Sequence, residues 1–170
     1  MKPESIAWKS LDTHGLEIAC LGKGFAEGKI IRVEADVPYE VSYTLKWNVN
    51  FEVTAATFEV FKNCETMTLN IQRLGGLTLD REVHLDIWPS PLTNALTIRR
   101  MGLKVGDTRT IQVLWVDATH LKASRETQTY THVSQNIYRF ESPSRNFKVD
   151  IEVNDEGQVV HYPELFLRVN

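Results

Sequence analysis

A two-residue alternation of apolar and polar side chains recurs along most of the chain and restricts the fold more than any other feature. Between positions 77 and 87 every odd position is apolar except Arg81, and every even position is polar. Successive side chains of a strand point to opposite faces, so this pattern predicts a half-buried strand or hairpin arm. Strand-like patterns of the same kind occur at 16–21, 29–34, 41–47, 51–60, 67–71, 111–115, 147–153 and 158–161. We therefore predict about ten or more antiparallel strands.

The composition favours the same fold class. The chain has 16 Val, 10 Ile and 15 Thr but 9 Ala among its 170 residues, and β-branched residues favour strands. No linker, low-complexity tract or clear internal repeat divides the sequence, so we predict a single domain spanning residues 1–170. So many strands in one domain must curl or close, because long flat sheets are unfavourable. The prediction is a mostly-β protein built on a single curled antiparallel sheet.

Two local features interrupt the alternation. The apolar parity changes at Ala55–Ala56, which predicts a β-bulge or bend. The segment Gly22–Gly28 has GxGxxxG spacing and precedes a strand-like stretch. A dinucleotide-binding loop needs GxGxxG and a following helix, so we interpret these glycines as a hairpin turn.

One segment is predicted to be a short helix, near residues 91–101. Ser90 can serve as the N-cap, and Pro91 suits the first helical position. Gly102 suits the position after the last turn, and two arginines in that turn complement the helix dipole.

Charge and cysteine content restrict the possible partners. The net charge is −3 with a pI near 6.0, which weighs against nucleic acid. No apolar run approaches the ~18 residues of a membrane span, and the first residues lack a secretory apolar region. We expect a cytoplasmic protein whose Cys20 and Cys64 are reduced and buried. We expect no cofactor and no metal ion.

Three polar side chains share one face of the predicted strand at 77–87, namely Glu82, His84 and Asp86. They could form a metal or acid/base site. We expect instead that they belong to a solvated outer face, because no other histidine or cysteine has metal-ligand spacing.

The second half of the chain holds a band of polar and aromatic residues. In the segment 127–133 neither face is plainly apolar, which indicates an edge strand or a polar-lined concavity. Tyr and Arg suit amphipathic ligands because each combines an apolar body with a polar tip. The candidate ligand-binding residues are Thr93, Asn94, Arg99, Arg100, Gln128, Tyr130, Tyr138 and Tyr162. Any of them could instead be structural, with Asn94 tying a loop and Arg99 fixing the helix to the sheet.

The segment 90–101, SPLTNALTIRRM, resembles the SPfTNtLPIRRL signature of the putative glycolipid-binding family, a bacterial family. Gln128–Tyr130 followed by Tyr138–Phe140 is similar to a later motif of that family. The closing segment 150–169 resembles its tail. The resemblance implies a spiral β-roll with a short helix, and binding of a glycolipid-like or other amphipathic molecule.

Three functional hypotheses follow. The first is a non-catalytic binding protein that holds an amphipathic ligand in the concave face, with Arg99 or Arg100 on its head group. The second is a structural or interaction module that binds a partner or forms a homo-oligomer. The third is an uncharacterised hydrolase-type enzyme using Tyr130, His132 and Arg99. No catalytic motif supports the third.

Overall fold

A computed structural model describes residues 3–72 and 83–170 of the chain. In this part of the chain, 13 strands form one sheet around one α-helix. The strands are β1 (Glu4–Ser10), β2 (His14–Gly22), β3 (Phe25–Glu34), β4 (Val37–Trp47), β5 (Val53–Lys62), β6 (Glu65–Gln72), β7 (His84–Trp88), β8 (Thr108–Asp117), β9 (Lys122–Ser134), β10 (Ile137–Ser142), β11 (Phe147–Val153), β12 (Val159–Tyr162) and β13 (Phe166–Arg168). The helices are α1 (Leu92–Met101) and the single 3-10 turn η1 (Pro143–Arg145).

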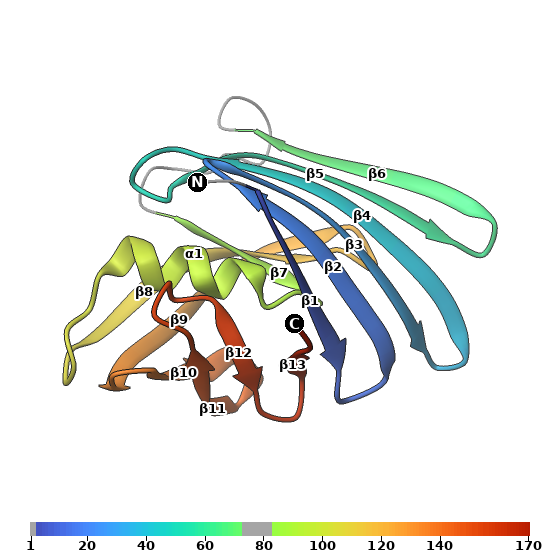
Figure 1. The fold of residues 1–170 in the computed structure, drawn as a ribbon. Coiled ribbons are helices and arrows are strands. Elements are labelled where there is room, and N and C mark those ends of the chain that lie inside the picture. The colour runs from blue at the N-terminus through green and yellow to red at the C-terminus, as the bar shows by residue number, and fades with distance from the viewer. Residues whose placement is uncertain (1–2, 73–82) are drawn as a thin grey trace.

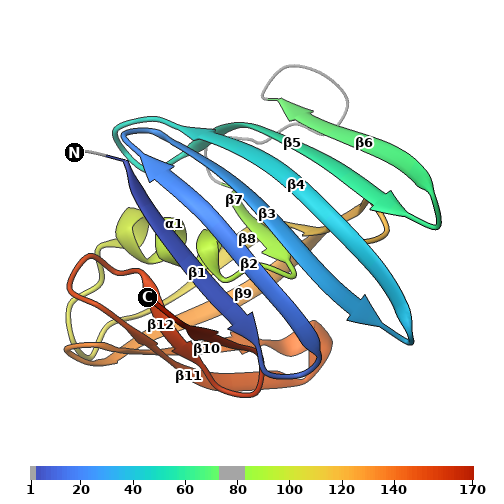
Figure 2. The same cartoon turned by 45° about the vertical axis from the view of Figure 1, so that its right-hand side comes forward.

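The sheet is curled so that its two ends face each other across α1 (Figures 1 and 2). Its strand order is β6-β5-β4-β3-β2-β1-β13-β12-β11-β10-β9-β8-β7, so the two terminal strands pair at its centre. The edges β6 and β7 do not pair, and the sheet is therefore curled but not closed. The predicted mostly-β fold with one curled sheet and one short helix is confirmed. One neighbouring pair departs from the antiparallel pattern, because α1 carries the chain from β7 to a parallel β8.

Three two-residue turns connect the strands of the N-terminal half. The β2–β3 turn is Lys23–Gly24, as the glycine-rich segment predicted. The β3–β4 turn is Ala35–Asp36 and the β5–β6 turn is Asn63–Cys64. Both residues of each of these two turns have positive φ. This backbone twist matches the twist of the flanking strands, which favours tight hairpins.

The change of parity in β5 comes from a bulge, as predicted. Lys46 of β4 pairs with Ala55, whereas Trp47 pairs with Val53, so Thr54 is the extra residue. The inward-facing set changes from Val53 to Ala56 across this bulge. The break lies one residue before the Ala55–Ala56 step of the sequence pattern.

Eight of the ten residues of helix α1 are buried, and the other two, Arg99 and Arg100, are half-buried. Pro91 has helical backbone angles, and the hydroxyl of Ser90 accepts a hydrogen bond from the N–H of Leu92 at 3.1 Å. Gly102 ends the helix in the left-handed conformation and donates its N–H to the carbonyl of Ile98. The helix thus begins one residue later than predicted, with Pro91 in the N-cap position and Leu92 as its first residue, and it ends at Gly102 as predicted.

Two expectations about burial were wrong. Cys20 and Cys64 are exposed free thiols. Cys20 lies on the outward face of β2 between the buried Ala19 and Leu21, and Cys64 occupies the β5–β6 turn.

The prediction that His84 and Asp86 lie on a solvated outer face of β7 is also wrong. His84 is buried against α1, where its Nδ1 lies 3.3 Å from the hydroxyl of Thr97, and Asp86 is half-buried beside Thr93 of the same helix. Burial lowers the pKa of His84 to about 4, and the positive charges of Arg100 and Arg109 add to the effect. Glu82 and the rest of the predicted strand before 83 lie outside the described residues.

The inner face of the N-terminal half contains one buried carboxylate. Glu17 is 3 % exposed and accepts hydrogen bonds from the hydroxyls of Tyr43 at 2.5 Å and Ser90 at 2.7 Å. Gly28 makes room for the Tyr43 ring, since a Cβ at this position would lie 2.2 Å from the ring carbon Cζ.

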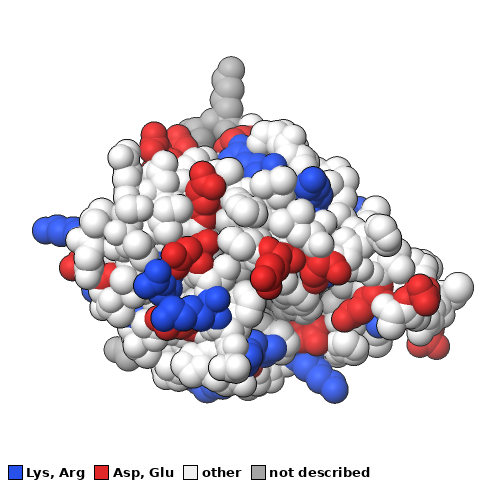
Figure 3. Space-filling model, turned by 90° about the horizontal axis from the view of Figure 1, so that it is seen from below, with Lys and Arg blue, Asp and Glu red and all other residues white. Residues whose placement is uncertain are grey.

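The surface has mixed character. On the face shown in Figure 3, acidic and basic side chains are interspersed. On the outer face of the sheet, Leu16 and Ile31 are paired and exposed, with Ile18 exposed beside them. A homo-oligomer stays a prediction. No helix of the described residues is long and apolar enough to cross a membrane.

Gly28→Ala should destabilise the fold, because its methyl group displaces the Tyr43 ring from Glu17. Overpacking of this kind costs about 1–3 kcal/mol. Urea unfolding of the variant should show that loss. Glu27→Ala, on the exposed face of the same strand, is the control and should stay within about 0.5 kcal/mol of the wild type. Equal stability of Gly28→Ala and the control would contradict this packing account.

Candidate functional site

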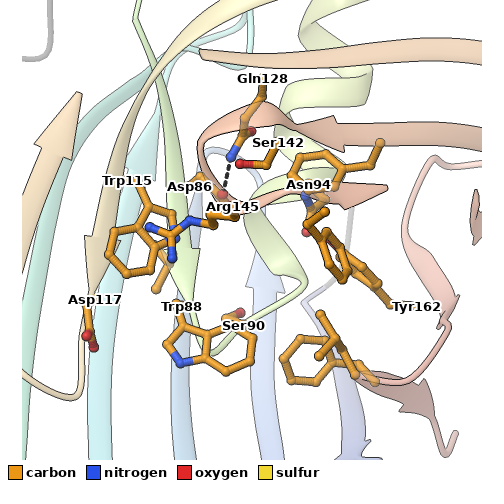
Figure 4. Close-up of a pocket in the computed structure, with 15 residues that line it drawn as sticks. Asp86, Trp88, Ser90, Asn94, Trp115, Asp117, Gln128, Ser142, Arg145 and Tyr162 are labelled. Carbon is orange, nitrogen blue, oxygen red and sulfur yellow. Dashed lines mark hydrogen bonds between the residues drawn. The ribbon is translucent and has the colours of Figure 1, made fainter. Parts of the chain in front are cut away.

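A pocket of about 380 Å³ opens between the C-terminal half of the sheet and the start of α1 (Figure 4). Its walls come from the seven strands β7 to β13, the start of α1, η1 and the loops beside these elements. The lining residues are Asp86, Ile87, Trp88, Ser90, Asn94, Trp115, Asp117, Gln128, Phe140, Ser142, Arg145, Phe147, Tyr162, Leu165 and Phe166.

Aromatic rings form most of the apolar wall. Trp88 and Phe166 pack with ring centroids 6.0 Å apart, and Tyr162 meets Phe166 edge-on at the same distance. Phe140 meets Tyr162 edge-on at 6.1 Å and is also tilted against Phe147 at 6.1 Å. Such pairs hold one another in place, so the wall offers a largely fixed apolar surface to a ligand.

A carboxylate and an amide form the polar side of the pocket. Gln128 donates from Nε2 to Oδ2 of Asp86 at 2.5 Å, and the hydroxyl of Thr93 donates to Oδ1 at 3.4 Å. Burial raises the pKa of Asp86, although these hydrogen bonds oppose the shift. Gln128 is 1 % exposed, yet its Oε1 has no hydrogen-bond partner. A buried acceptor without a donor is costly, and this one belongs to a residue that lines the pocket.

The start of α1 is tied to both halves of the sheet. Asn94 donates from Nδ2 to the hydroxyl of Tyr130 at 2.9 Å. Ser90 donates to Glu17 on β2. Burial raises the pKa of Glu17 to about 7, against the lowering effect of its two hydroxyl donors and of Arg32.

Arg145 lies at the solvent side of the pocket. Its guanidinium carbon is 3.5 Å from the centroid of Trp115. Nη2 and Nε donate to the two carboxylate oxygens of Glu126 at 2.7 and 3.2 Å. The positive charge of Arg145 is therefore already paired in the folded protein.

The structure brings together part of the predicted ligand-binding set. Asn94, Gln128 and Tyr162 line the pocket. Thr93 and Tyr130 do not line the pocket, but they form hydrogen bonds with residues that do. Thr93 donates to Asp86, and Tyr130 accepts from Asn94. Tyr138 is stacked on His132 with ring centroids 4.2 Å apart, and it does not line the pocket. The polar-lined concavity expected from 127–133 is present, because Gln128, Tyr130 and His132 all face inward.

The two arginines of α1 lie away from this pocket, at the other end of the helix. Arg99 donates from Nε to the carbonyl of Glu156 and lies over the ring of Phe51. It lines a second groove of about 620 Å³ with Lys23 and Trp47 among its neighbours. Arg100 donates from Nη1 to the carbonyl of Val83 at 3.0 Å. Both side chains thus bind backbone carbonyls of other segments.

Several lining residues were missing from the sequence prediction. They come from four different elements, which the pairing of the strands and the curl of the sheet bring together. These residues are Trp88, Trp115, Arg145 and Phe166. Asp86 was part of the polar strand face identified in the sequence. The sequence did not show that this face points into the pocket. Within the described residues no group of three or more His, Cys, Asp or Glu side chains is arranged to hold a metal ion.

Comparisons with known proteins agree with the fold. The model of a family described as "Putative glycolipid-binding" matches residues 5–168. The crystal structure of a DUF1089 family protein from Pseudomonas aeruginosa is similar, with 27 % identity and a TM-score of 0.84. The similarity covers 91 % of this chain and 92 % of that one. None of the curated proteins compared with the chain matched it.

Glu17 should make stability depend on pH. Between its ordinary pKa of 4.5 and its raised pKa of about 7, the unfolded chain is ionised at this residue while the folded protein keeps the proton. The free energy of unfolding should therefore fall as pH rises through this window, by up to about 3 kcal/mol.

Glu17→Gln should remove this dependence, because the amide can still accept from Tyr43 and Ser90 but cannot ionise. Urea unfolding at pH 5 and pH 8 measures the effect, with Glu27→Gln as an exposed control. Parallel pH profiles of the wild type and Glu17→Gln would show that Glu17 is not protonated in the fold.

Proposed function

The chain belongs to the putative glycolipid-binding family, and on that premise we propose that it binds one amphipathic, glycolipid-like molecule in the aromatic pocket. The observation that carries the proposal is the hydrogen-bonded pair of half-buried Asp86 and buried Gln128 beside an aromatic wall. Oε1 of Gln128 has no partner among the described residues and is free to accept a hydrogen bond from a ligand. The oxygens of Asp86 are acceptors as well. A ligand group that carries hydrogen-bond donors therefore suits this end of the pocket.

The apolar part of the ligand has a matching surface. Ligand pockets are lined mainly by apolar and aromatic side chains with a few placed polar groups. The rings of Trp88, Phe140 and Phe166 provide that surface beside the polar pair. Rings of this kind can pack against the apolar faces of a sugar or against the first carbons of an acyl chain.

The pocket volume restricts how much of the ligand enters. About 380 Å³ is near the lower end of the range of about 300–1,000 Å³ for small-molecule sites. We therefore place the head group and the adjoining carbons in the pocket, and the remainder of any acyl chain outside it.

The proposed role is binding without catalysis. Asp86, a half-buried carboxylate of the pocket, accepts hydrogen bonds from Gln128 and Thr93, so its oxygens organise the wall. A location in the cytoplasm stays a prediction.

Isothermal titration with octyl β-glucoside, kept below its micelle-forming concentration, tests the proposal. The wild type should bind one molecule per chain. Leu165→Trp should lower the affinity at least tenfold, because Leu165 lines the pocket and is partly exposed, so the larger ring fills the entrance.

Leu167→Trp is the matched control, since Leu167 is also partly exposed but lies outside the lining. It should bind like the wild type. Absence of binding to the wild type, or equal binding by Leu165→Trp, would refute the proposed site.

A further inference from the structure

The second groove, of about 620 Å³, differs from the aromatic pocket in charge and shares no lining residue with it. The β2–β3 turn, the loop between β4 and β5, and Arg99 of α1 form its walls. Trp47, Val49 and Phe51 supply its apolar surface, and Lys23 and Arg99 its charges. No acidic side chain of the described residues lines it.

The loop between β4 and β5 is held in one shape by its own hydrogen bonds. Oδ1 of Asn48 accepts from the N–H groups of Asn50 at 2.9 Å and Glu52 at 3.1 Å, and Nδ2 donates to the Glu52 carboxylate at 2.7 Å. The N–H of Trp47 donates to the carbonyl of Gly24 at 2.9 Å, which fixes the loop to the β2–β3 turn. The walls of the groove are therefore preorganised.

Phe51 has an unusual backbone for a bulky residue. Its φ of 59° lies in the left-handed region, which side chains of this size rarely adopt. The half-buried ring lies beneath the guanidinium of Arg99, whose Cζ is 5.5 Å from the ring centroid. Backbone strain of this kind is concentrated at ligand-binding positions, so Phe51 is a second indication that this groove holds a ligand.

The positive charges of the groove lack carboxylate partners. Arg99 donates from Nε to the backbone carbonyl of Glu156, and its terminal nitrogens donate to no other group of the described residues. Neither Arg99 nor the exposed Lys23 forms an ion pair within the described residues. The carboxylates of Glu156 and Glu4 act on Arg99 only from a distance, and both residues lie outside the lining.

The cations beside the aromatic pocket are different. Arg145 forms an ion pair with Glu126 at 2.7 Å, and Arg32 with Asp12 at 2.8 Å. The groove at the end of α1 thus offers positive charge that no side chain of the described protein neutralises.

We propose that this groove binds an organic acid with a flat apolar body, such as an aromatic carboxylate. The acid group lies on the terminal nitrogens of Arg99, and Lys23 adds a second positive charge. The apolar body lies against Trp47. This site goes beyond the proposed function and does not depend on it.

The hydrogen-bonding groups of the groove select an anion. Arg and Lys side chains only donate, so a carboxylate, which only accepts, matches both. The two terminal nitrogens of a guanidinium suit the two oxygens of a carboxylate. Asn48, the neutral polar side chain of the lining, already uses both ends of its amide within its loop. A neutral ligand therefore gains little here, and Lys23 and Arg99 repel a cation.

The test compares 1-naphthylacetate with 1-naphthylacetamide, which have the same ring system and differ in charge. Isothermal titration at pH 7 should show one acid bound per chain, at least fivefold more tightly than the amide. Raising the salt concentration should weaken the binding of the acid and leave that of the amide unchanged, because salt screens exposed charges.

Two variants identify the cations. Arg99→Gln should bind the acid at least tenfold more weakly than the wild type, and its amide can still donate to the carbonyl of Glu156. Lys23→Gln should bind the acid at least threefold more weakly, and since Lys23 is exposed, this variant keeps the fold. Lys122→Gln is the matched control, because Lys122 is exposed and lines neither site, and it should bind like the wild type.

Leu165→Trp, which fills the entrance of the aromatic pocket, should bind the acid like the wild type. Loss of acid binding in this variant would place the acid in the aromatic pocket and overturn the inference. Equal affinity of the wild type for acid and amide, absence of acid binding, or unchanged acid affinity in Lys23→Gln would overturn it as well. Binding of octyl β-glucoside is measured separately, so this groove can fail while the proposed function stands.

Discussion

The burial of α1 inside the curl of the sheet is the constraint on which the rest of the structure depends. A sheet of 13 strands has an apolar face too long to leave open, and curling covers that face only if something fills the space within. A helix buried on eight of its ten positions fills it. Three of the buried residues, Thr93, Asn94 and Thr97, are polar, and each has a hydrogen-bond partner on the surrounding strands. The residues that begin α1 also reach both halves of the sheet, so the same element organises the fold and the pocket.

The interior is more polar than the fold alone requires. Glu17, Arg32, Asp86 and Gln128 are all inside, and removing charged groups from water is expensive even when they are paired. Tyr43 and Ser90 satisfy one oxygen of Glu17, and Gln128 and Thr93 hold Asp86. The remaining unpartnered atoms lower stability in the free protein. One of them, Oε1 of Gln128, belongs to a residue that lines the aromatic pocket, as expected when stability is exchanged for a preorganised binding site.

The sequence was informative wherever local chemistry decides the structure. Alternation identified most of the strands, although β1, β10 and β13 were not predicted. The predicted start of the helix was one residue early, and Gly102 ended it as expected. The parity change in β5 located its bulge to within one residue. Alternation was misleading at β7, because the side of the strand that carries His84 and Asp86 faces α1 and the pocket instead of the outer surface. The pocket could be predicted only in part. Asp86 lies opposite Trp115 through a parallel pairing that depends on the path of α1, and Arg32 meets Trp88 only because the sheet curls. Such contacts join residues more than 25 positions apart and leave no periodic signal.

The central claim is that the Asp86–Gln128 side of the pocket holds the head group of an amphiphile. The most direct measurement is a crystal structure of the protein grown with octyl β-glucoside. The account predicts one sugar ring in the pocket, with a hydroxyl donating to Oε1 of Gln128 and the alkyl chain leaving past Arg145 and Leu165. A detergent molecule bound only in the groove beside Arg99 and Phe51, or only on the outer face of the sheet, would contradict it.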